Sequence, residues 1–302
     1  MELNGVINVY KEKGYTSHDV VNILKRELKS KTGHTGTLDP DAEGVLPICL
    51  GKSTKLADYI TAQIKRYRAE IYFGITTDTL DISGNILTDK RPVEVEKNDF
   101  LKVLDNFTGE ISQIPPMYSA IKINGEKLYS LARKGIEVER KPRNITIHKI
   151  DLIEFEPNKA VIDVICSKGT YIRSLCADIG EYLGCGGTMG NLLRIQNGRF
   201  SAENALKIDE IKEINAKGEI GKIVIPPQEF LTEYVEIHAK EEANRYLKNG
   251  NTINKSLVDA ELLETKAKYR LYDSKGEFIG LYVFTEKGFL KPEIILTDLS
   301  RM

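Results

Sequence analysis

The sequence predicts an α+β protein that ends in a small all-β module. Apolar residues recur with helical spacing over residues 20–28 and alternate with polar residues over 65–73. Helices and half-buried strands therefore occur in the same part of the chain. From about residue 233 the sequence pattern changes to short apolar runs separated by glycine-containing turns, which is typical of a small β domain. We therefore expect two domains, at residues 1–230 and 231–302.

The first elements carry local signatures. Residues 5–10 form a short apolar run that predicts a strand. Thr16 and Asp19 have the spacing of a capping hydroxyl and a first-turn acid, so a helix should begin after Thr16. Residues 45–50 are almost wholly apolar and indicate a buried strand, and an amphipathic helix is expected over 100–107.

The remaining elements of the first domain follow from turn and cap residues. Asn124-Gly125 lies between two extended stretches, which is a hairpin pattern. Thr170 is the expected cap of an apolar-striped helix over 172–183. We also expect two strands joined near Asn158, a further strand or turn, and a helix, at residues 145–154, 160–166, 191–195 and 208–214 respectively.

Composition places the chain among soluble cytoplasmic proteins. It has 302 residues, of which 41% are hydrophobic and 29% charged, and no apolar run approaches the length of a membrane span. The N-terminal residues do not resemble a signal peptide. The four cysteines contain no Cys-x-x-Cys pair and lie among apolar residues. We expect reduced core thiols, with neither disulfides nor a zinc site.

A polar loop at residues 33–44, with the sequence GHTGTLDPDAEG, is the strongest candidate for a functional site. Glycine and proline interrupt it too often for a regular helix or strand, yet it leads directly into the buried run at 45–50. Pro40 favours an extended conformation at Asp39 and so restricts where that carboxylate points. An isolated Asp-Pro is usually only a turn. A carboxylate is also a known nucleophile at sugar carbons.

Three other side chains accompany Asp39 as candidates. Tyr67 lies on the apolar face of the strand at 65–73, between two arginines. Tyr171 and Arg173 fall in the first turn of the helix at 172–183. An arginine is unfavourable at a helix N-terminus unless an outside carboxylate binds there. The acids of residues 76–84 match no metal-ligand spacing, so neither a metal nor another cofactor is expected.

A basic arm at about residues 121–147 is the candidate RNA-binding segment. The net charge of the chain is only −1, so a nucleic acid would have to be bound through local charge. Cations interleaved with Tyr129 suit an RNA backbone and a stacked base. The alternative is a solvated surface arm. The basic residues of this segment are Lys122, Lys127, Arg133, Lys134, Arg140, Lys141 and Arg143.

Four motifs in a fixed order resemble the bacterial tRNA pseudouridine synthase B family. The resemblance implies the pseudouridine synthase fold, in which helices flank a mixed or antiparallel central sheet, followed by a PUA-like RNA-binding domain. It also implies that one uridine of the tRNA T loop, at position 55, is flipped out and isomerised to pseudouridine. The motifs are GHTGTLDP at 33–40, KRYR at 65–68, SKGTYIR at 167–173 and LLR at 192–194.

The same resemblance implies roles for individual residues. Asp39 matches the catalytic aspartate and Arg173 its partner, while Tyr67 matches the tyrosine that stacks on the flipped base and Tyr171 an active-site tyrosine. The substrate-binding residues it implies are His34, Lys11 and Leu192. The family's usual Lys-Pro is Lys11-Glu12 here, so the turn after Lys11 departs from the family pattern.

Three alternatives remain open at this stage. The chain could be a non-catalytic RNA-binding or tRNA-folding protein, or a relative that depends on a guide RNA and partner subunits. A sugar hydrolase with Asp39 and Asp41 as its paired carboxylates is the weakest, because nothing sets the required separation. The favoured expectation is a monomeric enzyme that acts on the T arm of tRNA without an obligatory protein partner.

Overall fold

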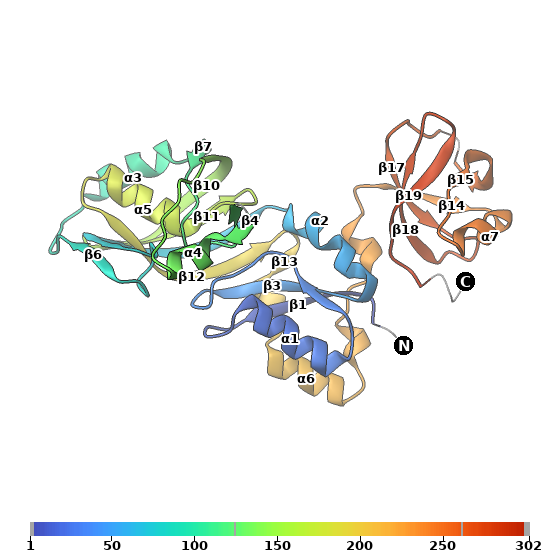
Figure 1. The fold of residues 1–302 in the computed structure, drawn as a ribbon, viewed down its shortest axis with the longest axis horizontal. Coiled ribbons are helices and arrows are strands. Elements are labelled where there is room, and N and C mark those ends of the chain that lie inside the picture. Colours follow the sequence, from blue (N-terminus) through green and yellow to red (C-terminus); the bar gives the residue numbers. More distant parts are fainter. Residues whose placement is uncertain (1–2, 124, 261, 299–302) are drawn as a thin grey trace.

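The computed structural model describes residues 3–123, 125–260 and 262–298. These residues form two lobes, a larger one that carries the N-terminus and a smaller one built from the C-terminal part of the chain (Figure 1). Each lobe contains its own β-sheet. Among the described helices, no helix is long and apolar enough to cross a membrane.

A nine-stranded sheet forms the centre of the larger lobe, with β1-β3-β12-β4-β11-β10-β7 in order, β2 beside β3 and β13 beside β12. β3 and β12 run parallel, whereas the other neighbours are antiparallel. The sheet is therefore mixed, as predicted. Its strands are β1 (Gly5–Lys11), β2 (Thr32–His34), β3 (Glu43–Leu50), β4 (Lys65–Phe73), β7 (Gly109–Gln113), β10 (Arg143–Glu156), β11 (Lys159–Cys166), β12 (Gly187–Asn197) and β13 (Phe200–Ser201).

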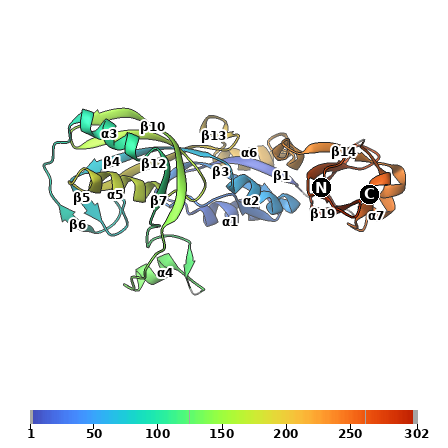
Figure 2. The ribbon, with the colours of Figure 1, turned by 90° about the horizontal axis from the view of Figure 1, so that it is seen from above.

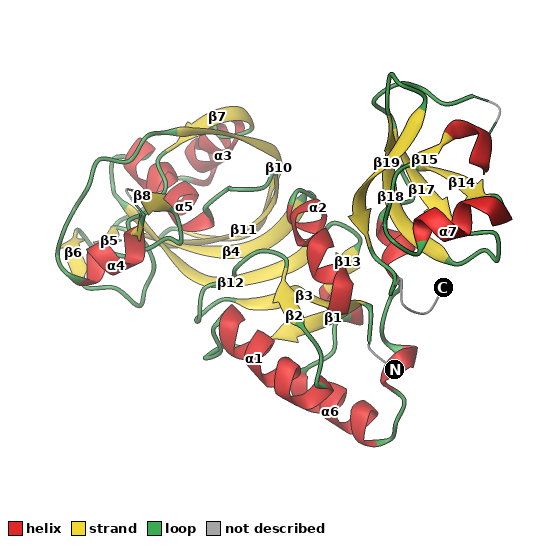
Figure 3. Cartoon of the chain, turned by 45° about the vertical axis from the view of Figure 1, so that its right-hand side comes forward, coloured by secondary structure: helices red, strands yellow, loops and turns green. Residues whose placement is uncertain are grey.

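The longer helices of this lobe each bury apolar residues along one face. α1 begins at a capping box in which the Thr16 and Asp19 side chains each bond the other residue's backbone N–H, as predicted. Its Leu24 is fully buried, and burial of such a side chain stabilises a fold by about 1.5–3 kcal/mol. α1 and α6 lie side by side (Figure 3). The helices are α1 (Ser17–Leu28), α2 (Ala57–Thr61), α3 (Lys97–Asn106), α4 (Leu128–Arg133), α5 (Ile172–Tyr182) and α6 (Ile208–Ala216).

Two local predictions differ from the structure. Residues 33–34 belong to β2, which pairs with β3, so the glycine-rich stretch starts as a strand and becomes a loop only afterwards. Thr170 does not cap α5. Its hydroxyl donates instead to the Ser167 carbonyl, and Tyr171 is the N-cap residue, with no side-chain cap. The Tyr171 N–H donates to Gln113 Oε1 on β7 at 2.8 Å, so a distant strand holds the residue at which the helix begins.

Two short hairpins extend from the larger lobe. The predicted hairpin near residue 124 is confirmed by the pairing of Lys122 with Lys127, while Asn124 itself lies outside the described residues. The second hairpin contains the acids of residues 76–84. The strands are β5 (Ile75–Thr77) with β6 (Ile86–Asp89), and β8 (Lys122–Ile123) with β9 (Glu126–Lys127).

The smaller lobe is a six-stranded sheet in the order β15-β19-β18-β17-β14-β16, with one short helix, α7 (Asn244–Leu247). A buried apolar cluster joins it to the larger lobe and includes Val6, Leu56, Leu231 and Leu281. The lobes therefore share a core. The strands are β14 (Val235–Ala239), β15 (Ile253–Asn254), β16 (Val258–Asp259), β17 (Lys268–Tyr272), β18 (Phe278–Phe284) and β19 (Phe289–Ile295).

Candidate active site

A pocket of about 250 Å³ opens between the polar loop, strands β4 and β12 and the start of α5. Segments far apart in the sequence meet there because β3, β12 and β4 are neighbours in the sheet. Most of the residues that the motifs singled out line this one pocket, namely Asp39, Tyr67, Tyr171, Arg173 and Leu192.

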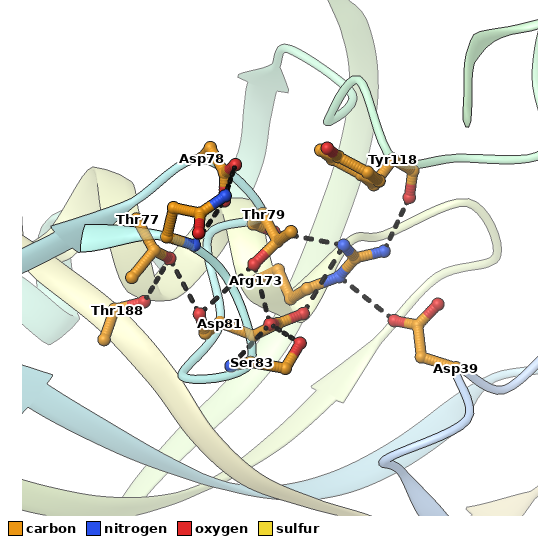
Figure 4. Close-up of polar contacts among 10 residues, drawn as sticks. Asp39, Thr77, Asp78, Thr79, Asp81, Ser83, Tyr118, Arg173 and Thr188 are labelled. Carbon is orange, nitrogen blue, oxygen red and sulfur yellow. Dashed lines mark hydrogen bonds and ion pairs between the residues drawn. The ribbon is translucent and has the colours of Figure 1, made fainter. Parts of the chain in front are cut away.

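Asp39 and Arg173 form an ion pair in the pocket. Asp39 Oδ2 lies 3.0 Å from Arg173 Nε, and the Arg173 side chain is 6% exposed whereas that of Asp39 is 40% exposed. The guanidinium also donates to the carbonyls of Tyr118 at 2.8 Å and Thr79 at 3.1 Å (Figure 4). The expectation that an outside carboxylate binds at the start of this helix is confirmed. Arg173 is held at several points, so its position is fixed before any ligand arrives.

The electrostatic environment of Asp39 contains opposing contributions. Burial raises the pKa of this carboxyl above its ordinary value, and the charge of Arg173 lowers it. Asp81 raises it further, Lys11 lowers it, and the net direction is upward. Arg173 therefore offsets part of the penalty for keeping a carboxylate in a partly desolvated site.

Asp81 is a second carboxylate at Arg173 that no sequence motif singled out. Its Oδ2 lies 3.6 Å from Arg173 Nη1, and its side chain is 16% exposed. Its Oδ1 accepts hydrogen bonds from the hydroxyls of Thr79 and Ser83, which fix the carboxylate in the turn. The acids of residues 76–84 were visible in the sequence, but no local pattern indicates which of them reaches α5.

Lys11 does not line the pocket. Its side chain is fully buried, and Nζ donates to the Pro40 carbonyl at 3.1 Å and to the Glu12 carbonyl at 3.2 Å. Burial lowers the pKa of Lys11 to about 8. Lys11 thus holds the backbone immediately after Asp39, and a contact of Lys11 with a substrate stays a prediction.

Further side chains restrain the Asp39 loop through hydrogen bonds to its backbone. Ser17 Oγ donates to the Leu38 carbonyl at 3.0 Å and accepts from the Leu38 N–H at 2.8 Å. Asn197 Nδ2 donates to the Thr35 carbonyl at 3.2 Å. Because buried backbone groups need partners, these bonds restrict an irregular loop to one conformation.

The two tyrosines give the pocket an aromatic lining. Tyr67 is 8% exposed and sits on the inward face of β4, as predicted from the alternation. Burial raises the pKa of both Tyr67 and Tyr171, so both are neutral phenols near pH 7. Neutral aromatic faces suit a flat, uncharged ring such as a nucleobase.

His34 lies outside the pocket lining, on β2. Its Nδ1 is buried and, among the described residues, has no hydrogen-bond partner. Burial, followed by the charge of Arg194, lowers the pKa of this imidazole, which is therefore neutral near pH 7. A contact of His34 with a substrate stays a prediction.

The basic arm projects away from the sheet as β8, β9 and α4, whereas its final residues, from Arg143, enter β10 (Figure 2). Lys127 Nζ and the Arg133 guanidinium lie 5.3 and 5.6 Å from the ring centre of Tyr129. Lys134 pairs with Glu126, and Arg140 pairs with Glu137, while Lys122 and Lys141 are exposed. The arm thus presents cations around one aromatic ring, and RNA binding by these residues stays a prediction.

Comparison with known proteins agrees with this geometry. The description "TruB family pseudouridylate synthase (N terminal domain)" fits residues 22–172, and "tRNA pseudouridylate synthase B C-terminal domain" fits residues 173–232. The chain belongs to the TruB family of pseudouridylate synthases. It is therefore a member of an isomerase family.

Curated relatives cover almost the whole chain. The protein named tRNA pseudouridine synthase B from Clostridium perfringens (strain ATCC 13124) is 45% identical over 98% of this chain and 100% of its own length. The protein of the same name from Clostridium tetani is 47% identical over 95% of this chain and 98% of its own length.

Solved structures share the fold of both lobes. The chain matches a crystal structure of a Cbf5-Nop10-Gar1 complex with a TM-score of 0.72 and 26% identity, over 98% of this chain and 86% of that chain. It matches a crystal structure of the archaeal box H/ACA sRNP Nop10-Cbf5 complex with a TM-score of 0.71 and 23% identity, over 97% and 86% of the two chains. The predicted pseudouridine synthase fold is confirmed, and the C-terminal β lobe is consistent with a PUA-like domain.

Proposed function

We propose that this chain converts the uridine at position 55, in the T loop of tRNA, into pseudouridine. The observation that carries the proposal is the Asp39–Arg173 ion pair, 3.0 Å long, on the wall of a pocket that Tyr67 and Tyr171 also line. Relatives that carry the name tRNA pseudouridine synthase B over nearly the full chain support tRNA as the substrate. The T-loop position rests on the motif resemblance.

The target base must leave its stack to reach Asp39, at a cost of about a few kcal/mol. Stacking on an aromatic side chain offsets roughly 1–3 kcal/mol per base, and Tyr67 and Tyr171 both line the pocket. Their burial keeps the phenols neutral, so neither repels an uncharged uracil. The aromatic pocket thus stabilises the flipped base and places its ribose near the carboxylate.

The reaction is an isomerisation that breaks the N1–C1′ bond and forms a C5–C1′ bond; the C5 proton is released to solvent and N1 takes up a proton from solvent, so atoms and charge balance. Asp39 acts in its ionised form, as a nucleophile or as a stabiliser of positive charge at the sugar. Arg173 keeps that carboxylate ionised and oriented. No oxidation or reduction accompanies the rearrangement, so the residues of the pocket balance the step without a further reactant.

The basic arm binds the phosphates of the T arm in this proposal. Lys122 and Lys141 are exposed, and Tyr129 is flanked by Lys127 and Arg133. Phosphate contacts supply affinity and register, whereas the pocket selects the base. The enzyme works as a monomer, without a protein partner or a guide RNA.

Tritium release tests this function directly. An unmodified T-arm transcript carrying [5-³H]-uridine is incubated with the purified chain alone, because only isomerisation expels the C5 hydrogen. We expect stoichiometric release from a transcript whose sole labelled uridine is at position 55, and none from a transcript labelled only at a different uridine. Binding without release would favour an RNA-binding protein. Release only from a complex with added partner proteins would favour a guide-dependent relative.

A further inference from the structure

Arg194 is a buried guanidinium that the proposed chemistry leaves without a role. It is 1% exposed and lies on β12, where its Cα is in register with Gly44 of β3 on one side and Tyr67 of β4 on the other. It also lines the pocket that contains Asp39. Arg194 therefore lies between β3, which follows the Asp39 loop, and β4, which carries Tyr67.

The Arg194 side chain joins the two ends of the Asp39 loop. Nε donates to the Val45 carbonyl at 2.6 Å, and Nη2 donates to the Gly36 carbonyl at 3.1 Å. Gly36 precedes Asp39 by three residues and Val45 follows it by six. A planar guanidinium presents donors in a fixed geometry, so it sets the separation of these carbonyls.

The charge of Arg194 is not neutralised by an ion pair. Within the part of the chain that the structure describes, no carboxylate lies within ion-pair distance of it, in contrast to Arg173. Burial and then the charge of Arg194 lower the pKa of His34 and Lys65, and the same charge opposes the upward effect of burial on the pKa of Tyr67. A buried charge without a counterion is costly, and a neutral residue would fill the same space at lower cost, so packing alone does not account for an arginine here.

The backbone is equally restricted where the loop ends. Gly44 has φ +107°, and a Cβ at this position would lie 2.3 Å from the Arg194 carbonyl oxygen. Only glycine allows β3 to approach β12 so closely in this conformation. The Arg194 backbone therefore fixes one end of the loop by contact, and its side chain holds both ends by hydrogen bonds.

We propose that Arg194 is a positioning residue, which sets the place of the Asp39 carboxylate relative to the target ribose by holding the Gly36 and Val45 carbonyls. The proposal rests on the proposed function. A displacement of about 1 Å between reacting groups lowers a rate by about 100-fold. Loss of Arg194 should therefore slow the chemical step while tRNA binding persists.

The test compares Arg194→Lys and Arg194→Met with wild type and with Arg199→Met. Lysine keeps the charge but lacks the planar set of guanidinium donors, and methionine removes both the charge and the donors. Arg199 pairs with Glu229 on the surface and serves as the matched control. Each protein is tested for thermal unfolding, for tRNA affinity and binding stoichiometry, and for the single-turnover rate of pseudouridine formation at saturating enzyme.

We expect Arg194→Lys to fold, to bind tRNA at full stoichiometry with a Kd within about threefold, and to react about 100-fold more slowly. Arg194→Met should be slower still, and Arg199→Met should match wild type. A wild-type rate in either Arg194 variant would overturn the proposal, and so would a loss confined to binding. Failure of both variants to fold would assign Arg194 to stability and also contradict it. Inactivity of wild type itself would refute the proposed function instead.

Discussion

Asp81 and Asp39 share one guanidinium. Arg173 Nη1 lies 3.6 Å from Asp81 Oδ2, and Arg173 Nε lies 3.0 Å from Asp39 Oδ2. The second carboxylate raises the pKa of the first, because like charges disfavour joint ionisation. The loop at residues 77–83 thereby influences the ionisation of a residue more than thirty positions earlier in the chain.

Replacement of Asp81 by asparagine should shift the pH dependence of the reaction. The activity requires ionised Asp39 and falls as pH drops through the pKa of that carboxyl. Since Asp81 raises this pKa, Asp81→Asn should move the acidic limb of the pH–rate profile to lower pH. Single-turnover rates across the acidic range measure the effect. Asp78→Asn, in the same loop, is the control and should leave the limb in place, whereas a shift of Asp81→Asn to higher pH would contradict the assignment.

Asp39→Asn should abolish turnover while binding remains. The amide cannot act as a nucleophile or carry negative charge, so we expect a rate loss of about 10³-fold or more. The phosphate contacts remain, so tRNA affinity should stay within about tenfold. Tritium release and filter binding on one preparation check both statements. Substantial pseudouridine formation by this variant would refute the role given to Asp39.

Arg173→Met should affect both activity and stability. The variant leaves the Thr79 and Tyr118 carbonyls without their donor, which should lower the free energy of unfolding by about 1–3 kcal/mol. The rate should fall by about 10²–10³-fold. Because Arg173 lowers the pKa of Asp39, the acidic limb should also move to higher pH. Arg91→Met, which removes an exposed pair with Asp89, should change none of these quantities.

Neutralising the basic arm should weaken the salt dependence of tRNA binding. Each phosphate contact contributes about 0.9 to the slope of log K against log salt concentration. Glutamine at Lys122, Lys127 and Lys141 together should therefore reduce the slope by up to about 3. Titrations of tRNA at several salt concentrations measure it. The same change at Lys212, Lys217 and Lys222, in and after α6, should have no effect; an equal reduction there would point to nonspecific attraction.

Stability should rise with pH because of Lys65. Burial lowers the pKa of Lys65 from 10.5 to about 8, so between these values the unfolded chain binds more protons than the folded one. The contribution of Lys65 to the free energy of unfolding therefore increases from pH 8 toward 10.5, by up to about 3 kcal/mol. Denaturant titrations should show that the free energy of unfolding of wild type rises relative to that of Lys65→Met between pH 8 and 10.5. The exposed Lys217→Met should give a constant difference from wild type.

Much of the local structure was predictable because its causes are local. The capping box at Thr16 and Asp19 starts α1 as expected, and the alternation over residues 65–73 places Tyr67 on the buried face of β4. The cap at Thr170 was predicted wrongly: Tyr171 is the N-cap residue, and the Thr170 hydroxyl donates to the Ser167 carbonyl. A hydroxyl before an apolar stripe therefore does not by itself show which residue begins the helix, because that hydroxyl can bond the preceding turn instead.

The sequence by itself determined most of the elements, the Asp39 loop and the family, because propensity, periodicity and motif order are properties of neighbouring residues. Only the tertiary structure decided that Asp81 faces Arg173, that Lys11 lies beneath the loop, and that Arg194 joins its two ends. These contacts depend on the order β3-β12-β4 in the sheet. That order follows from the burial of the whole apolar surface, so no single segment specifies it.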